Sequence, residues 1–159
     1  MKALLVVDIQ AGLLKKNDVF EEELFLQTVN EKIKTFQKNK ELIVYIQHNN
    51  KNLIYGKSDW EIDKRILKKD DDIVIQKFHG NAFMDTDLRK ILDANNIDEI
   101  TVCGLVTHAC VRATCLGCVK EGYKTKLLKD GHSNWQSDPE QTIKDVEAEL
   151  WGVGVTVES

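Results

Sequence analysis

The sequence predicts an α/β fold in three layers (α/β/α), with helices on both faces of a doubly wound, mainly parallel six-stranded sheet. Three observations support this prediction. Apolar runs of strand length alternate with stretches of helical period along the whole chain. These runs are nearly continuous and rich in β-branched residues, which is typical of strands buried on both faces. The repeated alternation of strand and helix favours parallel pairing, because each crossover places a helix on one face of the sheet.

The expected elements follow one another in order along the chain. Strands are expected at 2–8, 41–47, 73–76, 99–103, 124–128 and 153–157. Helices are expected at 21–39, 59–68, 85–95, 108–121 and 138–151. Within the first helix, Leu24, Val29, Ile33 and Phe36 recur at roughly helical spacing. The last helix has Pro139 at its first position, which is a favoured start. The segment 49–58 is the most loop-like part of the chain.

Length and charge limit the classes of function. With 159 residues, no linker rich in proline, glycine or serine and no internal repeat, we expect one domain over residues 1–159. The net charge is −4 and basic residues are scattered among acidic ones, so nothing resembles a stripe that binds nucleic acid. No apolar run approaches the roughly 20 residues that span a bilayer. The apolar start is too short for a signal peptide, so we expect no membrane partner and a cytoplasmic location.

Reactive side chains follow three of the predicted strands. Asp8 ends LLVVD, Lys77 ends DIVIQK, and Cys110 comes shortly after ITVCGLV. Because the carboxyl ends of parallel strands meet at one edge of a sheet, we expect these side chains to converge. A carboxylate that accepts a thiol proton and an ammonium that stabilises the thiolate together activate a nucleophile. This combination predicts a hydrolase that acts through a covalent thioester acyl-enzyme.

Each of the three residues also has a purely structural interpretation. Asp8 could cap a helix at a strand-to-helix turn, and Lys77 could be one of many surface lysines. Cys110 could simply pack its helix against the sheet. Its place in the first turn, after a Thr107 whose hydroxyl can cap the helix, favours a thiol pKa lowered by the helix dipole.

The remaining cysteines and histidines are weaker candidates. Cys115 and Cys118 have the spacing of a redox or zinc pair, but no second pair follows at metal-ligand spacing, so packing is the simpler interpretation. His48 and His79 lie at strand ends, where a zinc site would need further ligands. We therefore expect no metal and no cofactor.

Several side chains are candidates for the wall of a substrate pocket, although an aromatic side chain is more often part of the core. The expected wall consists of Gln10, His48, Trp60, Phe83 and Thr107, and Phe78 is a further aromatic candidate. His108 and His132 are expected at the pocket wall or on the surface.

The motifs at the strand ends resemble those of the isochorismatase-like cysteine hydrolases, a superfamily that includes nicotinamidases. They are Asp8-Ile9-Gln10 after LLVV, KFHGNAF starting at Lys77, TDL starting at Thr86, and GLVTHACV at 104–111. The stretch ATCLGCVKEGYKTKLLKD (113–130) is similar to a helix, a Gly-Tyr turn and the following strand of that family. The motifs occur in family order, and the resemblance covers nearly the whole chain.

The resemblance implies a catalytic triad of Asp8, Lys77 and Cys110. It also implies a cis peptide bond between Leu105 and Val106, and an oxyanion hole formed by the N–H groups of Val106 and Cys110. Two fixed donors there would stabilise the negative charge that develops on a carbonyl oxygen under attack. Homodimers or larger homo-oligomers are implied as well.

The sequence departs from the nicotinamidase pattern at the metal site. Nicotinamidases have an Asp-x-His after the second strand and a further His, whereas this chain reads YIQHNNKN at the corresponding place. The pattern is therefore more similar to the smaller, metal-free members. Isochorismatases proper resemble the fold but lack the cysteine, so Cys110 argues against their vinyl-ether chemistry.

The resulting hypothesis is a metal-free amidohydrolase that acts on a small-molecule substrate with an amide or related C–N bond. An alternative is a catalytically silent small-molecule binding or assembly protein on the same scaffold. A third is a thiol-redox or zinc protein that uses Cys115 and Cys118. The identity of the substrate is left open by the sequence.

Overall fold

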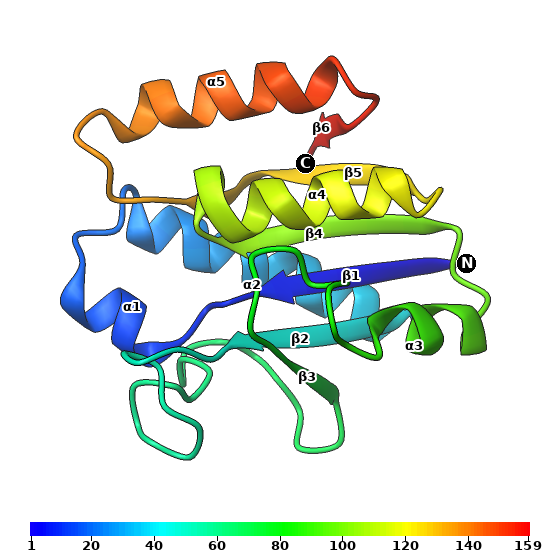
Figure 1. Cartoon of the computed structure of the whole chain (residues 1–159), viewed down its shortest axis with the longest axis horizontal. Coiled ribbons are helices and arrows are strands. Elements are labelled where there is room, and N and C mark those ends of the chain that lie inside the picture. Colours follow the sequence, from blue (N-terminus) through cyan, green and yellow to red (C-terminus); the bar gives the residue numbers. More distant parts are fainter.

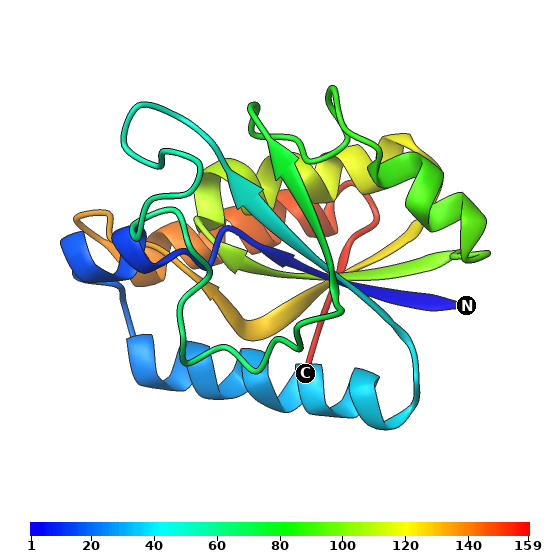
Figure 2. The same ribbon diagram turned by 90° about the horizontal axis from the view of Figure 1, so that it is seen from below.

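A computed structural model describes all 159 residues, and its six strands form a single sheet in the order β3-β2-β1-β4-β5-β6. The strands are β1 (Lys2–Val7), β2 (Leu42–His48), β3 (Ile73–Lys77), β4 (Glu99–Leu105), β5 (Lys124–Ser133) and β6 (Thr156–Glu158). Every neighbouring pair runs parallel. Figure 2 shows the strands fanning out with the twist that is usual for such sheets. The predicted α/β fold is confirmed, and the sheet is parallel throughout.

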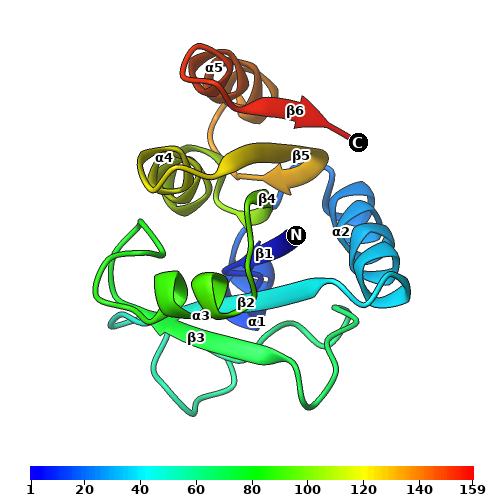
Figure 3. The ribbon, with the colours of Figure 1, turned by 90° about the vertical axis from the view of Figure 1, so that its right-hand side faces the viewer.

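Helices cover both faces of the sheet. They are α1 (Ala11–Lys16), α2 (Glu22–Lys38), α3 (Leu88–Ala94), the π-helix η1 (Thr107–Val111), α4 (Arg112–Lys120) and α5 (Pro139–Trp151). Figure 1 shows α4 following β4, and Figure 3 shows α2 on one side of the sheet with α3 and α4 on the other. None of the helices has both the length and the apolar character that a membrane span requires.

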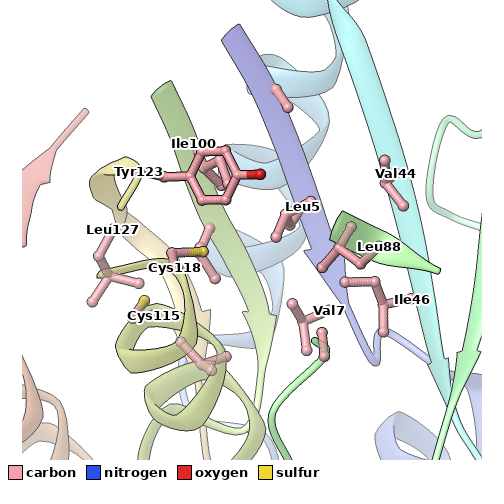
Figure 4. Close-up of a cluster of buried hydrophobic side chains, with 14 of the residues drawn as sticks. Leu5, Val7, Val44, Ile46, Leu88, Ile100, Cys115, Cys118, Tyr123 and Leu127 are labelled. Carbon is pink, nitrogen blue, oxygen red and sulfur yellow. The ribbon is translucent and has the colours of Figure 1, made fainter. Parts of the chain in front are cut away.

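The continuous apolar run of β1 follows from its place at the centre of the sheet. Leu5 and Val7 point to the face covered by α3 and α4, whereas Leu4 and Val6 point to the face covered by α2. Figure 4 shows Leu5 and Val7 among apolar side chains of the first face. Both faces of the strand are therefore buried, and each such side chain contributes about 1.5–3 kcal/mol relative to an exposed position.

The predicted helix at 59–68 is wrong. These residues form turns that pair with the chain after β1, through a bridge between Gln10 and Ile62 and a hydrogen bond from Asp63 N–H to the Ile9 carbonyl. The side chains of Gln10 and Gln47 also donate to the Trp60 carbonyl at 2.9 and 3.0 Å. Because long-range partners use these backbone groups, no helical ladder forms.

The other differences from the predicted elements are smaller. Helix α1 was not predicted, and no side chain caps its amino end. Helix α3 is shorter than the expected 85–95, and β6 is shorter than the expected 153–157. Strand β5 continues to Ser133, beyond the expected 128, and its register against β4 shifts between Val102 and Gly104.

Gly104 lies where β4 passes close to β1. Its φ is 126°, and a Cβ built on it would lie 2.0 Å from the Val7 carbonyl oxygen. Neither the backbone angle nor the space accommodates a side chain. Glycine at this position therefore permits β4 to pair closely with β1 just before the loop that carries Cys110.

We expect Gly104→Ala to lower the free energy of unfolding by about 3 kcal/mol or more, because the new methyl group overlaps the backbone of β1. Gly154→Ala is the matched control, since Gly154 also has a positive φ, of 101°, but nothing lies within 4 Å of the added Cβ. The control is expected to lose about 1–2 kcal/mol through its backbone angle alone. Urea unfolding measures both, and equal losses would contradict this account of Gly104.

Candidate active site at the carboxyl edge of the sheet

The register of the sheet brings the reactive residues to one edge. Asp8 follows β1 directly, and the last residue of β1, Val7, is aligned with Ile46 of β2 and Gly104 of β4. His48 and Lys77 are aligned partners at the ends of β2 and β3. The connection from β3 to β4 takes the chain to the other half of the sheet, so the strand order reverses between the neighbouring strands β1 and β4. Open α/β sheets form their crevices at such switch points.

The Lys77 ammonium lies at the centre of this group. Its Nζ is 2.9 Å from Asp8 Oδ2, 3.1 Å from Cys110 Sγ and 2.7 Å from His48 Nδ1. A fourth acceptor, the His79 carbonyl oxygen, lies at 3.1 Å. The side chain of Lys77 is fully buried. An ammonium has three protons, so four acceptors engage all of them and fix the nitrogen in place.

Asp8 presents one engaged and one unpartnered oxygen. Oδ2 accepts from Lys77, whereas Oδ1 is buried and has no hydrogen-bond partner. Burial raises the pKa of Asp8, and the charge and hydrogen bond of Lys77 oppose that rise. The residue also has a positive φ of 52°, which is uncommon for a residue other than glycine. The carboxyl group therefore has a free acceptor oxygen and a greater affinity for a proton than an ordinary carboxylate.

Cys110 lies in the first turn of η1, which continues into α4. A carboxylate oxygen of Asp8, a ring nitrogen of His48 and the Cys110 sulfur lie within 4.8 Å of one another. Burial raises the pKa of the Cys110 thiol to about 12; the charge of Asp8 adds to this rise and Lys77 opposes it. The lowered pKa expected from the helix dipole is therefore wrong, because burial and the neighbouring carboxylate outweigh it. Burial and the Asp8 charge therefore favour the protonated thiol over the thiolate.

His48 is held as a neutral ring. Its Nδ1 accepts from the Lys77 ammonium, so the ring proton is on Nε2. Burial, and then the charge of Lys77, lower the pKa of His48 to about 4. The other ring nitrogen, Nε2, has no hydrogen-bond partner within the protein. It is not fully buried, so it is accessible to solvent. His48 thus contributes an N–H donor on a ring that has one nitrogen within 4.8 Å of the Cys110 sulfur.

Gln10 and Trp60 belong to a network that holds the connection between β2 and β3 over this edge. The Gln10 amide donates to the carbonyl oxygens of Trp60 and His48 and accepts from the His48 N–H, and its side chain is fully buried. The indole of Trp60 donates to Gln76 Oε1 at 3.0 Å. The Gln10 amide therefore has its partners within the protein, and it holds the backbone of His48 and Trp60 in place.

Phe83 and Thr107 both have partners within the protein. The Phe83 ring stacks on that of Tyr123, with centroids 6.0 Å apart, and packs on the apolar cluster around Leu5. Thr107 is buried, and its Oγ1 pairs with His132 Nδ1 at 2.9 Å. No side chain caps η1, so the predicted helix cap by Thr107 is wrong. The peptide bond between Leu105 and Val106 is cis, as the resemblance implies.

Comparison with known proteins agrees with this fold. Residues 2–149 match the isochorismatase domain model. The isochorismatase family protein YddQ of Bacillus subtilis (strain 168) is 28% identical over 99% of this chain and 95% of its own length. The chain belongs to the isochorismatase family. A crystal structure of an isochorismatase family protein superposes with a TM-score of 0.94 at 26% identity, covering 99% of this chain and 98% of the other.

Another relative matches the present protein over a shorter stretch. The N-carbamoylsarcosine amidase of an Arthrobacter species is 36% identical over 70 residues, which is 44% of this chain and 26% of that enzyme.

A cysteine pair suggested by the sequence and a cluster brought together by the fold do not fit a redox or metal site. Cys115 and Cys118 lie among apolar side chains between α4 and the sheet, as Figure 4 shows, and burial raises the pKa of both thiols. Asp8, His48 and Cys110 have the composition of a metal site. The Lys77 ammonium already touches all three, so a cation among them would face a fixed positive charge. These residues fit an ammonium and do not fit a metal ion.

The contact between His48 and Lys77 was not foreseen from the sequence. Both were recognised as strand-end residues, but pairing β2 with β3 in register would have been needed to bring them together. The partnership of Thr107 with His132 joins residues 25 positions apart and has no local signal.

We expect Asp8→Asn and Lys77→Met to shift the pKa of Cys110 in opposite directions. Loss of the Asp8 charge should lower that pKa by about 1–3 pH units, and loss of the Lys77 charge should raise it, since the two charges act oppositely on the thiol. The ultraviolet absorbance of the thiolate, titrated against Cys110→Ala, measures this. Shifts of the same sign would contradict the assigned charges. Asp8→Asn alone tests the first half if Lys77→Met does not fold.

We also expect His48 to make stability dependent on pH. The folded pKa of about 4 lies below the ordinary 6.5, so the unfolded chain binds a proton first as pH falls. The contribution of His48 is complete above pH 6.5 and decreases as pH falls towards about 4. His48→Gln should therefore lose less stability over this window than the wild type in urea unfolding. A ring that titrates near pH 6.5 by NMR would contradict this prediction.

Proposed function

We propose that this isochorismatase-family chain is a cysteine hydrolase of a small amide or related C–N bond, with Asp8, Lys77 and Cys110 as its triad. One observation carries the proposal: a buried ammonium touches both the sulfur and one carboxylate oxygen, while the other carboxylate oxygen has no partner. The name of the Arthrobacter amidase supports the class of bond.

The proposed reaction starts from the thiol. As the Cys110 sulfur attacks the substrate carbonyl, its proton moves to Asp8, whose raised pKa favours acceptance. The tetrahedral intermediate has its negative charge on the former carbonyl oxygen, where the N–H groups of Val106 and Cys110 are proposed to donate. Collapse breaks the C–N bond, and the departing amine takes the proton from Asp8. A thioester to Cys110 remains.

The second half of the proposed reaction releases the acid. Asp8, again a carboxylate, takes a proton from a water molecule as that water attacks the thioester carbonyl. The C–S bond breaks and the sulfur regains its proton from Asp8. Lys77 holds Asp8 throughout and stabilises the sulfur whenever negative charge develops on it. The free enzyme is restored with no net change of protonation.

The substrate pocket of this proposal is the solvent-facing side of the triad. His48 adds a side-chain donor to it, because its Nε2–H has no partner in the protein. It suits a carbonyl or other acceptor on an uncharged substrate. Trp60 and Gln10 act indirectly, by holding the wall, and Phe83 and Thr107 belong to the packing behind it. We further propose a cytoplasmic protein that forms homodimers or larger homo-oligomers.

A catalytically silent binding or assembly protein is the second candidate. The observation in its favour is the raised pKa of Cys110, which leaves little thiolate at neutral pH. In that case the same residues would bind a small molecule without forming a thioester. The two candidates differ in whether an acyl group is ever attached to sulfur.

We expect Cys110→Ala to lower turnover of any amide, carbamate or ureide hydrolysed by the wild type by at least about 10³-fold, because no thioester can form. Asp8→Asn should lose about 10²–10⁴-fold through the missing proton acceptor. A screen of such compounds, with mass spectrometry for an acyl adduct on Cys110, measures both. Cys103→Ser is the matched control, since Cys103 is a free, buried strand cysteine. A wild type that hydrolyses none of them and forms no adduct would favour the silent scaffold.

A further inference from the structure

A second buried polar group lies behind the loop that carries Cys110. His132 Nδ1 is 2.9 Å from Thr107 Oγ1, and His132 Nε2 is 2.9 Å from Glu147 Oε2 on α5. The side chain of His132 is fully buried, whereas that of Glu147 is 23% exposed. None of these three side chains has a role in the proposed reaction. Together they form a series of hydrogen bonds from α5 to the start of η1, after β4.

The Glu147 carboxylate determines which group donates in each of these hydrogen bonds. Glu147 can only accept when it is ionised, so His132 donates through Nε2–H. In the neutral ring Nδ1 then has a lone pair, and the Thr107 hydroxyl donates to it. One acceptor at α5 therefore fixes the tautomer of His132 and, through it, the orientation of Thr107.

This series of hydrogen bonds ends at Thr107, in the turn between the cis peptide bond and Cys110. His132 is aligned with Gly104 in the sheet, and Thr107 follows Val106 directly. The N–H groups of Ala109 and Val111 donate to the Val106 carbonyl, and that of Arg112 donates to the Thr107 carbonyl. Movement of Thr107 would therefore displace the peptide groups of Val106 and the first turn of η1.

We propose that Glu147 and His132 are positioning residues that hold Thr107, and through it the Val106 N–H, in place for stabilising the developing oxyanion. This inference rests on the proposed function, because it assigns a purpose to the loop only if Cys110 attacks a carbonyl. It makes α5 part of the catalytic apparatus, although α5 contributes no group to the triad. A small misplacement of a transition-state donor is costly in rate, by about 10²-fold for 1 Å.

Two probes of Cys110 separate this role from a general structural one. p-Nitrophenyl acetate reacts through attack of sulfur on a carbonyl carbon: an acetyl thioester forms, p-nitrophenolate leaves, and water later releases acetate. This reaction passes through an oxyanion. Iodoacetamide reacts by displacement at a saturated carbon, forming a C–S bond and releasing iodide and a proton. That reaction has no oxyanion, so it reports only whether the sulfur is present, accessible and reactive.

We expect Glu147→Met to slow Cys110-dependent acylation by p-nitrophenyl acetate by about 10- to 100-fold, and to change the rate of iodoacetamide alkylation by less than about 3-fold. Glu147→Gln should stay within about 3-fold of the wild type in both reactions, because its side-chain oxygen can still accept from Nε2–H. Glu140→Met is the matched control, since Glu140 lies on the same helix, pairs only with Lys144 and is 65% exposed. Thr107→Val and Thr107→Ser form a second pair, in which only valine should slow acylation.

The outcomes distinguish the two proposals. Equal losses in both reactions, or losses in neither, would overturn the positioning role of Glu147 while leaving the triad intact. A wild type in which iodoacetamide labels Cys110 but the ester forms no Cys110-dependent acetyl adduct would contradict the proposed function, and this inference with it. Slowed acylation in Glu147→Met and Thr107→Val, with alkylation unchanged and recovery in the conservative variants, would support it.

Discussion

The buried ammonium of Lys77 is the interaction on which the whole edge of the sheet depends. Four segments far apart in the chain supply its partners: Asp8 after β1, His48 at the end of β2, the carbonyl of His79 after β3 and the sulfur of Cys110 after β4. Removing a charge from water costs several kcal/mol, and an ion pair offsets this only with good geometry and further hydrogen bonds. Here the nitrogen has all its protons engaged, so the charge can remain in a fully buried place. The same contacts bring an acid, an imidazole and a thiol within reach of each other.

The sheet makes that convergence possible, and the charge in turn determines the protonation of its neighbours. Because Val7 is aligned with both Ile46 and Gly104, the carboxyl ends of three adjacent strands lie side by side at one edge of the sheet. Glycine at 104 permits the close approach of β4. Once Lys77 is in place, His48 must accept and is therefore neutral, and one oxygen of Asp8 is occupied while the other is free. Burial raises the pKa of Asp8 and that of Cys110 together, so in the proposed reaction the proton would move between two groups that both disfavour the charged form.

Much of this could be predicted from the sequence, for a physical reason. A strand buried on both faces must be apolar along its length, so the six strands were recognisable, and residues at their ends share an edge whatever the detailed packing. That argument suffices for bringing Asp8, Lys77 and Cys110 together. It fails where distant partners determine the local structure: a helix was expected at 59–68, but the backbone of that segment is bound by the chain after β1. Thr107 follows a strand as a capping residue would, but its hydroxyl is taken by His132.

The direction of the Cys110 pKa shows most clearly what a sequence cannot supply. The position of a thiol in a helical turn is a local property, and it predicted stabilisation of the thiolate. Desolvation and the charge of Asp8 are properties of the assembled site, and they act more strongly in the opposite sense. A cysteine that remains a thiol until a carbonyl approaches is also less exposed to adventitious oxidation, because the thiolate is the form that oxidants attack. Within the proposed reaction, burial of this pair therefore favours activation by Asp8 at the moment of attack over a permanent thiolate.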